Sequence, residues 1–377
     1  MVKSLRSLDM TGAVNYHYGQ FPPDNLDAGK LLVPLANATA ALARYDQMLK
    51  TMHNSEILLA PLRNQEAVIS SRMEGTISTL DEVLQLEADH GDEPEAGDYR
   101  TEAMEVYLYS IAMRRAQSAM TDGQPLTSAL VRRIHAVLLG FGRGAALSPG
   151  QFKTEQNYLA DRARGKVRFV PISPEQLAPA MDDLFAYAAD DTVQILIRTA
   201  ITHLEFEALH PFKDGNGRIG RMLITLMLWH HGVVSAPHFY VSRVFEDNRD
   251  RYIDLMRQVS ATGDWTNWVV FFLEALETQA RENLGKAEEI RDLYERLKIE
   301  LRDRLSSTWF QTALDFLFTH PVFRNNVFTG KSGIPVAAAH RIARILVDDG
   351  YLTIVQPAAG RRPALYSFEP LLELVRD

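Results

Sequence analysis

The chain has 377 residues, of which 46% are hydrophobic and 23% charged, and its formal net charge is −8. This composition is ordinary for a soluble globular protein of two or three domains, and the negative charge argues against general binding of polyanions by the whole molecule. The absence of cysteine excludes disulfides, thiolate metal sites and cysteine nucleophiles.

The N-terminus lacks a signal-peptide pattern, and the most apolar helical run, 222–229, is far too short to cross a bilayer. We therefore expect a cytoplasmic protein with no membrane contact, and we interpret 222–229 as a buried core helix.

The first hundred residues are predicted to form an N-terminal helical domain (1–100). Residues 1–30 look irregular, and helical patterns dominate from Leu31. One helix is expected over 64–73, with Gly75 just past its end. The run Thr79-Leu80-Asp81-Glu82 has the pattern of a capping box and predicts the start of another helix.

A second domain is predicted over 101–285, with helices at 101–120, 127–139, 192–209, 217–231, 246–260 and 265–283. Between them, 151–159 and 166–171 read as two strands of a hairpin. The charged run 286–305 is expected to be a solvated helical connector.

The last part, 306–377, is predicted to be a winged helix-turn-helix domain. Helices are expected at 309–318 and 335–348, followed by a hairpin with Arg361 and Arg362 at its tip. The segment from Pro321 to Leu365 contains six Lys or Arg and two Asp. Its local positive charge suits the phosphate backbone of DNA. Such folds also serve as dimerisation or protein-binding modules, so DNA contact and a homodimer both stay open.

The most informative stretch is 210–221, which reads His-Pro-Phe-Lys-Asp-Gly-Asn-Gly-Arg-Ile-Gly-Arg. A helix is expected to start near Gly217, where free N–H groups and the helix dipole attract phosphate. Arg218 and Arg221 share a face of that helix and can hold oxyanions. Asp214 is suited to bind Mg²⁺ together with phosphate oxygens, and His210 is placed to act as a base.

This stretch matches the Fic signature H-x-F-x-[DE]-G-N-G-R-x-x-R at every fixed position, so the chain resembles the Fic family. The resemblance implies a mainly α Fic core with a hairpin flap, and transfer of AMP from ATP to a protein hydroxyl with Mg²⁺. His210 would be the general base and Asp214 the metal ligand. The backbone of Gly215, Asn216 and Gly217, with the Asn216 side chain, would cradle phosphate, and Arg218 and Arg221 would clamp the β- and γ-phosphates.

Two other segments acquire roles from the same resemblance. Ser70, Glu74 and Gly75 fit the family's inhibitory pattern, in which Glu74 would pair with Arg221 and exclude the γ-phosphate. The hairpin resembles the flap that would hold a target protein as an added strand. The residues expected to dock the target are Asn157, Tyr158 and Leu159.

Two single residues outside these segments also have an expected role. Tyr252 falls where relatives contact adenine, whereas His203 is interpreted as a core histidine whose ring nitrogens have hydrogen-bond partners.

Three functions remain open: a self-inhibited protein adenylyltransferase, a DNA-binding transcriptional regulator with a nucleotide-sensing Fic core, and an enzyme that removes AMP or transfers another group. The intact His210 favours an enzyme.

Overall fold

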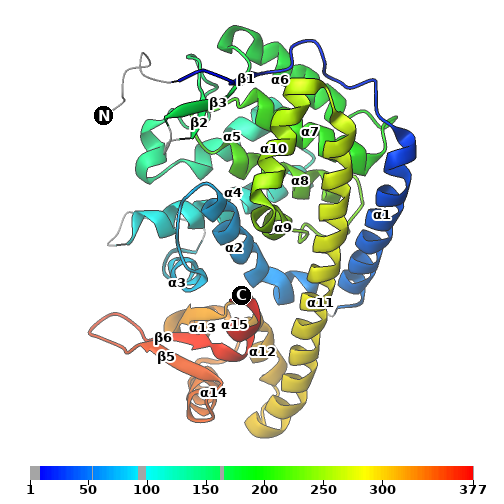
Figure 1. The fold of residues 1–377 in the computed structure, drawn as a ribbon. Helices are drawn as coiled ribbons and strands as arrows, with labels where there is room; N and C mark the ends of the chain where they lie inside the picture. The colour runs from blue at the N-terminus through cyan, green and yellow to red at the C-terminus, as the bar shows by residue number, and fades with distance from the viewer. Residues whose placement is uncertain (1–8, 53, 92–98, 162–164, 377) are drawn as a thin grey trace.

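The computed structural model describes residues 9–52, 54–91, 99–161 and 165–376. Helices dominate this part of the chain, so the expectation of a mainly α fold is confirmed (Figure 1). The first five helices are α1 Ala28–Thr51, α2 Ser55–Met73, α3 Leu80–His90, α4 Thr101–Thr121 and α5 Ser128–Leu138. The next six are α6 Pro174–Ala188, α7 Ile195–Leu209, α8 Asn216–His230, α9 Ser242–Asp247, α10 Arg249–Thr262 and α11 Trp265–Leu305.

Local signals in the sequence set the ends of α2 and α3. Gly75 has a φ of 86°, and the N–H groups of Gly75 and Thr76 donate to the carbonyls of Arg72 and Ser71, which closes α2 with a Schellman motif. Thr79 and Glu82 form the predicted capping box at the start of α3.

The predicted hairpin is only partly correct. Its strands are β2 Leu159–Asp161 and β3 Lys166–Val170, and a third strand, β1 Val14–Asn15, pairs in parallel with β3. Residues 151–158 form no strand, because Lys153 donates its backbone N–H to the Pro211 carbonyl and not to a neighbouring strand. In the sheet order β1-β3-β2, the strand β2 lies at an edge.

Helix α8 is the centre of the core, as expected for 222–229. Every residue from Asn216 to Leu228 is buried, including two arginines. Helix α7 packs along α8, and α4 and α5 also contact it. The loop that joins α7 to α8 therefore lies against several helices at once.

The helix expected over 246–260 is two helices, α9 and α10, because Asn248 interrupts it with non-helical torsion angles. The Asn248 side chain donates to the Val244 carbonyl, and so competes with the regular backbone pairing. In contrast, 265–283 and the connector 286–305 form one unbroken helix of 41 residues, α11, which runs beside α1 (Figure 1).

The C-terminal part contains α12 Phe310–Thr319, β4 Val322–Arg324, α13 Asn325–Lys331, α14 Val336–Asp348, β5 Leu352–Gln356, β6 Leu365–Phe368 and α15 Glu369–Val375. The sequence indicated all of these except β4, α13 and α15. The strands form a second sheet in the order β4-β6-β5. Helix α12 packs directly on α2, so the C-terminal elements touch the helix that carries Ser70 (Figure 1). No helix in the described residues is both long and apolar enough to span a membrane.

Candidate functional site

The loop between α7 and α8 has left-handed backbone conformations at both ends. His210 ends α7 with φ 47° and ψ 61°, and Gly215 precedes α8 with φ 78°. Asn216 was expected to reach an anion with its side chain. Instead, that side chain closes the loop by accepting from the Phe212 N–H at 2.8 Å and donating to the Phe212 carbonyl at 2.9 Å.

His135, on α5, supports the same loop and was not identified from the sequence. Its ring stacks on Phe212 with centroids 3.7 Å apart. Its Nδ1 accepts from the Gly150 N–H at 2.8 Å, so its Nε2 carries the proton and donates to the Asp214 carbonyl at 2.9 Å. Burial lowers the pKa of His135 to about 4, so the ring is neutral and this tautomer is kept.

The start of α8 offers donors for an anion. The side chain of Arg218 is 3% exposed, and its Nη2 lies 3.7 Å from Oδ2 of Asp214. Its Nε and Nη1 are buried and have no hydrogen-bond partner among the described residues. Because buried guanidinium donors are costly to leave unsatisfied, this arrangement suits phosphate oxygens.

Arg221 is bound by the segment that the sequence had indicated as inhibitory. Its Nε donates to Ser70 Oγ at 2.8 Å, and its Nη2 donates to the Ser70 carbonyl at 2.7 Å and to Glu74 Oε1 at 2.8 Å. The predicted ion pair between Glu74 and Arg221 is therefore present. A Cβ on Gly217 would collide with the Glu74 carboxylate, so the glycine allows this carboxylate to reach α8.

Three further contacts fix α2 beside the site. Glu66 accepts from Ser242 of α9 and from Tyr109 of α4, and Arg72 pairs with Glu246 at 2.6 Å. The position of Glu74 is thus determined by packing of the whole helix and not by one ion pair.

The electrostatic environment favours a neutral His210 and an ionised Glu74. Burial, and then the positive charge of Lys153, lower the pKa of His210 to about 4, although Glu74 and Asp214 oppose this. Burial disfavours the charge on Glu74, but the charge and hydrogen bond of Arg221, and then the charge of Arg218, outweigh it and lower its pKa. At neutral pH the imidazole can therefore accept a proton.

His203 is a structural residue, as expected, because its Nδ1 and Nε2 contact the Gly220 carbonyl and the Tyr252 hydroxyl. Tyr252 is 4% exposed and packs on Phe245, so its contact with adenine stays a prediction. Glu207 was missed: its Oε1 is buried without a hydrogen-bond partner in the described chain, and burial raises its pKa to about 8. The sequence signal that could have identified Glu207 is its place one helical turn before His210.

The residues expected to dock a target protein are divided by the structure. Leu159 begins the edge strand β2, whereas Asn157 and Tyr158 precede it. The Asn157 side chain points to the loop and donates to the carbonyls of His210 and Phe212. Asn157 therefore supports the loop, and docking of a target protein by these three residues stays a prediction.

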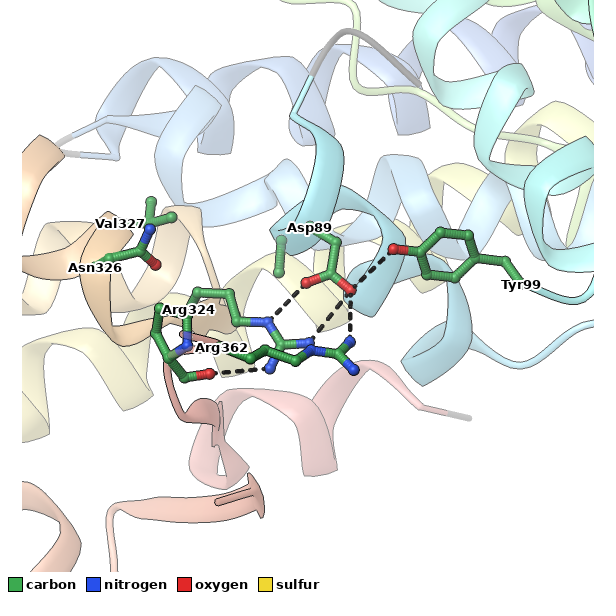
Figure 2. A pocket seen from close by; sticks show the side chains of 8 residues that line it. Asp89, Tyr99, Arg324, Asn326, Val327 and Arg362 are labelled. Atoms are coloured by element: carbon green, nitrogen blue, oxygen red, sulfur yellow. Dashed lines mark hydrogen bonds and ion pairs between the residues drawn. The ribbon is translucent and has the colours of Figure 1, made fainter. Parts of the chain in front are cut away.

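A separate cavity of about 470 Å³ lies between the end of α3 and the C-terminal elements (Figure 2). Asp89 is its centre: it pairs with Arg324 at 2.7 Å and with Arg362 at 3.4 Å, and Tyr99 donates to it at 3.4 Å. Arg362, expected at the tip of a DNA-binding hairpin, thus contacts α3 and is still about half exposed. The residues of the signature do not line this cavity.

Comparison with known proteins matches two consecutive parts of the chain. Residues 32–118 match the Fic/DOC family N-terminal region, and 125–228 match the Fic/DOC family. The chain is 32% identical over 94 residues to the protein adenylyltransferase fic-1 of Caenorhabditis elegans, which is 24% of this chain and 17% of that protein. It is 26% identical over 204 residues to a probable protein adenylyltransferase of Aquifex aeolicus, covering 54% of this chain and 57% of that one.

These matches span less than two thirds of the length of either relative. A solved structure of a Fic family protein from Desulfovibrio desulfuricans has the same fold over 92% of this chain and 98% of its own, with a TM-score of 0.58 and 20% identity.

Proposed function

Because the chain is a Fic/DOC domain protein, we propose that it transfers AMP from ATP to a Ser, Thr or Tyr hydroxyl of a target protein, and of itself. The observation that carries this proposal is a neutral, partly buried His210 at one end of a short loop, with the unsatisfied donors of Arg218 at the start of α8 at its other end. The adenylyltransferase names of the two relatives support the same chemistry.

The phosphates of ATP would be held at the start of α8. Its free N–H groups and dipole favour negative charge, and the buried Nε and Nη1 of Arg218 would gain partners. Arg221 would bind the outermost phosphate, in the position that Glu74 occupies here. This kind of transfer depends mainly on positioning and on stabilising charge, which these residues provide.

Asp214 fits the role of a Mg²⁺ ligand. Its carboxylate is about half exposed at the start of α8, with Arg218 at 3.7 Å. The described residues contain no group of three or more metal-binding side chains, so Mg²⁺ would take its other ligands from phosphate and water, as this ion usually does. Bound there, Mg²⁺ would neutralise charge on the phosphates.

His210 would take the proton of the target hydroxyl as its oxygen attacks the α-phosphorus, and pyrophosphate would leave. The low pKa of His210 keeps the base unprotonated at neutral pH. The edge strand β2 would hold the target as an added strand, with backbone hydrogen bonds that are independent of side-chain identity.

Glu74 would inhibit this reaction. It occupies Arg221 and places a negative charge where the γ-phosphate would bind. The wild-type chain would then bind ATP in a misaligned position and transfer AMP slowly.

A second candidate function is DNA binding by the C-terminal part, with the Fic core as a nucleotide sensor. Its elements follow the order of a winged helix, from α12 through the hairpin β5–β6. Arg341, Arg344 and Arg361 are exposed on α14 and in that hairpin. We assign these arginines to phosphate contacts.

Incubation with Mg²⁺ and ATP labelled at the α- or γ-phosphate distinguishes these functions. Adenylylation predicts label on protein from the α-phosphate alone, and label from the γ-phosphate would indicate a kinase. Absence of both labels in wild type and in Glu74→Gly, together with retention on DNA, would favour the regulator.

A further inference from the structure

His210 has an unusual backbone conformation for the residue proposed as the base. Its φ of 47° lies in the left-handed region, which costs a non-glycine residue about 1 kcal/mol or more. Such a conformation persists only where its surroundings enforce it. The segment 150–158, between α5 and β2, provides these surroundings.

Two residues of that segment bind four consecutive carbonyl groups of the loop. Lys153 donates from Nζ to the carbonyl of Leu209 at 3.0 Å, and from its backbone N–H to that of Pro211 at 2.8 Å. Asn157 donates from Nδ2 to the carbonyl of His210 at 3.0 Å and to that of Phe212 at 3.2 Å. The carbonyl groups of His210 and Pro211 are thus both held by the segment 150–158.

The two residues also hold each other. Nζ of Lys153 donates to Oδ1 of Asn157 at 2.9 Å, so the whole amide of Asn157 is used. This network assigns the orientation of the amide, because the opposite orientation would place its oxygen against two carbonyls.

The chemistry of Lys153 indicates more than a structural role. It is 3% exposed, and its side chain contacts only neutral oxygen atoms, with no carboxylate in ion-pair distance among the described residues. Burying an unpaired ammonium is costly, and a neutral donor could make the same hydrogen bonds without this cost. The ammonium lies close enough to His210 for its charge to oppose protonation of the imidazole.

We propose that Lys153 and Asn157 are positioning residues, which hold His210 in its left-handed conformation and, through the charge of Lys153, keep its imidazole neutral. This inference rests on the proposed role of His210 as the base. Their hydrogen bonds go to the carbonyls of residues 209–212 and to each other, so both act through His210.

The direction of the pH effect follows from the groups that face His210. Lys153 disfavours the imidazolium, whereas Glu74 from the end of α2 and Asp214 from the loop favour it. Burial lowers the pKa of Lys153 to about 7, so Lys153 is charged over the range, around pH 4 to 6, in which His210 gains its proton. Loss of that charge must raise the pKa of His210.

The test compares Lys153→Met, Lys153→Arg and Asn157→Ala, each combined with Glu74→Gly to remove inhibition. Lys153→Met should lower kcat for AMP transfer about 10- to 100-fold, with little change in the KM for ATP. The acid limb of its kcat–pH profile should move up by about one pH unit. Lys153→Arg should return the acid limb to its original pH. Asn157→Ala should lower kcat without shifting the acid limb. Lys166→Met, on strand β3, is the matched control and should change neither kcat nor the position of the acid limb.

A second measurement does not depend on activity. The imidazole of His210 is titrated by NMR in the full-length chain, with His210→Ala identifying its signal among the 11 histidines. Its pKa should rise in Lys153→Met and return in Lys153→Arg. An unchanged pKa in folded Lys153→Met would overturn the inference, whether or not the chain transfers AMP. If Glu74→Gly transfers no AMP but this pKa shifts as expected, the proposed function fails and the electrostatic effect of Lys153 on His210 stands.

Discussion

The contact between Glu74 and Arg221 permits a quantitative prediction of autoinhibition. Replacing Glu74 with glycine removes the carboxylate that binds Nη2 of Arg221 at 2.8 Å and covers Gly217. It leaves the other two hydrogen bonds of Arg221, to Ser70, in place. We expect Glu74→Gly to transfer AMP faster than the wild type at equal ATP concentration.

The size of the gain can be estimated from this one contact. Hydrogen bonds between charged groups contribute about 1.5–3 kcal/mol each. Arg221 is 2% exposed, but the Glu74 side chain is 36% exposed, so solvent screening favours the lower end of that range. About 1.5 kcal/mol corresponds to roughly a tenfold gain, since every 1.4 kcal/mol is a factor of ten. Relief of the collision between Glu74 and the γ-phosphate adds to this value.

Self-modification is measured with ATP labelled at the α-phosphate. Glu74→Gln is the matched variant, because it keeps the bulk of the side chain and loses the charge, and it should show part of the gain. Glu74→Gly combined with Arg221→Ala should lose the gain, because the gain requires that arginine. Equal rates for wild type and Glu74→Gly would refute the reasoning.

Three further predictions follow from the same contacts. In the Glu74→Gly background, His210→Ala should abolish AMP transfer while ATP affinity is kept; isothermal titration and AMP incorporation are measured together, and undiminished incorporation would disprove its role as base. Asp214→Asn should raise the Mg²⁺ concentration for half-maximal transfer about tenfold or more, and chelation with EDTA should stop the wild type; an unchanged Mg²⁺ dependence would remove Asp214 as a ligand. Asp89→Asn should free Arg362 and tighten binding to duplex DNA at low salt. Arg361→Ala with Arg362→Ala should weaken binding and reduce the slope of log binding constant against log salt concentration by about two. If no variant retains DNA, a protein-binding module is favoured.

The sequence predicted those features that depend on residues close together in the chain. The capping box at Thr79 and the left-handed Gly75 are set by their immediate neighbours, and the structure has both. The ion pair of Glu74 with Arg221 spans 147 residues, and it was predicted only because both residues fit a family pattern.

The features that were missed depend on contacts with no local pattern. Strand β1 has two residues, too few to show an alternation of polar and apolar side chains. In the first half of the predicted hairpin, Lys153 and Asn157 use their donors on the loop 209–212, more than 50 residues later. His135 is similar, because its partner Asp214 is 79 residues away.

The helix α11 limits how the C-terminal part can be exchanged or moved. With 41 residues it is about 60 Å long, and the boundary predicted at 285/286 falls inside it. The backbone N–H of Asp27, before α1, donates to the Thr266 hydroxyl near the start of α11. Arg291, beyond that boundary, contacts Met48 near the end of α1, so a cut at 285 would remove part of the surface that covers α1. Helical phase imposes a stricter limit. One residue inserted between 292 and 305 would rotate everything after it by about 100° around the helix axis, which would separate Arg324 from Asp89. In this chain, length variation is therefore tolerable in the loops of the C-terminal part but not in the helix that carries it.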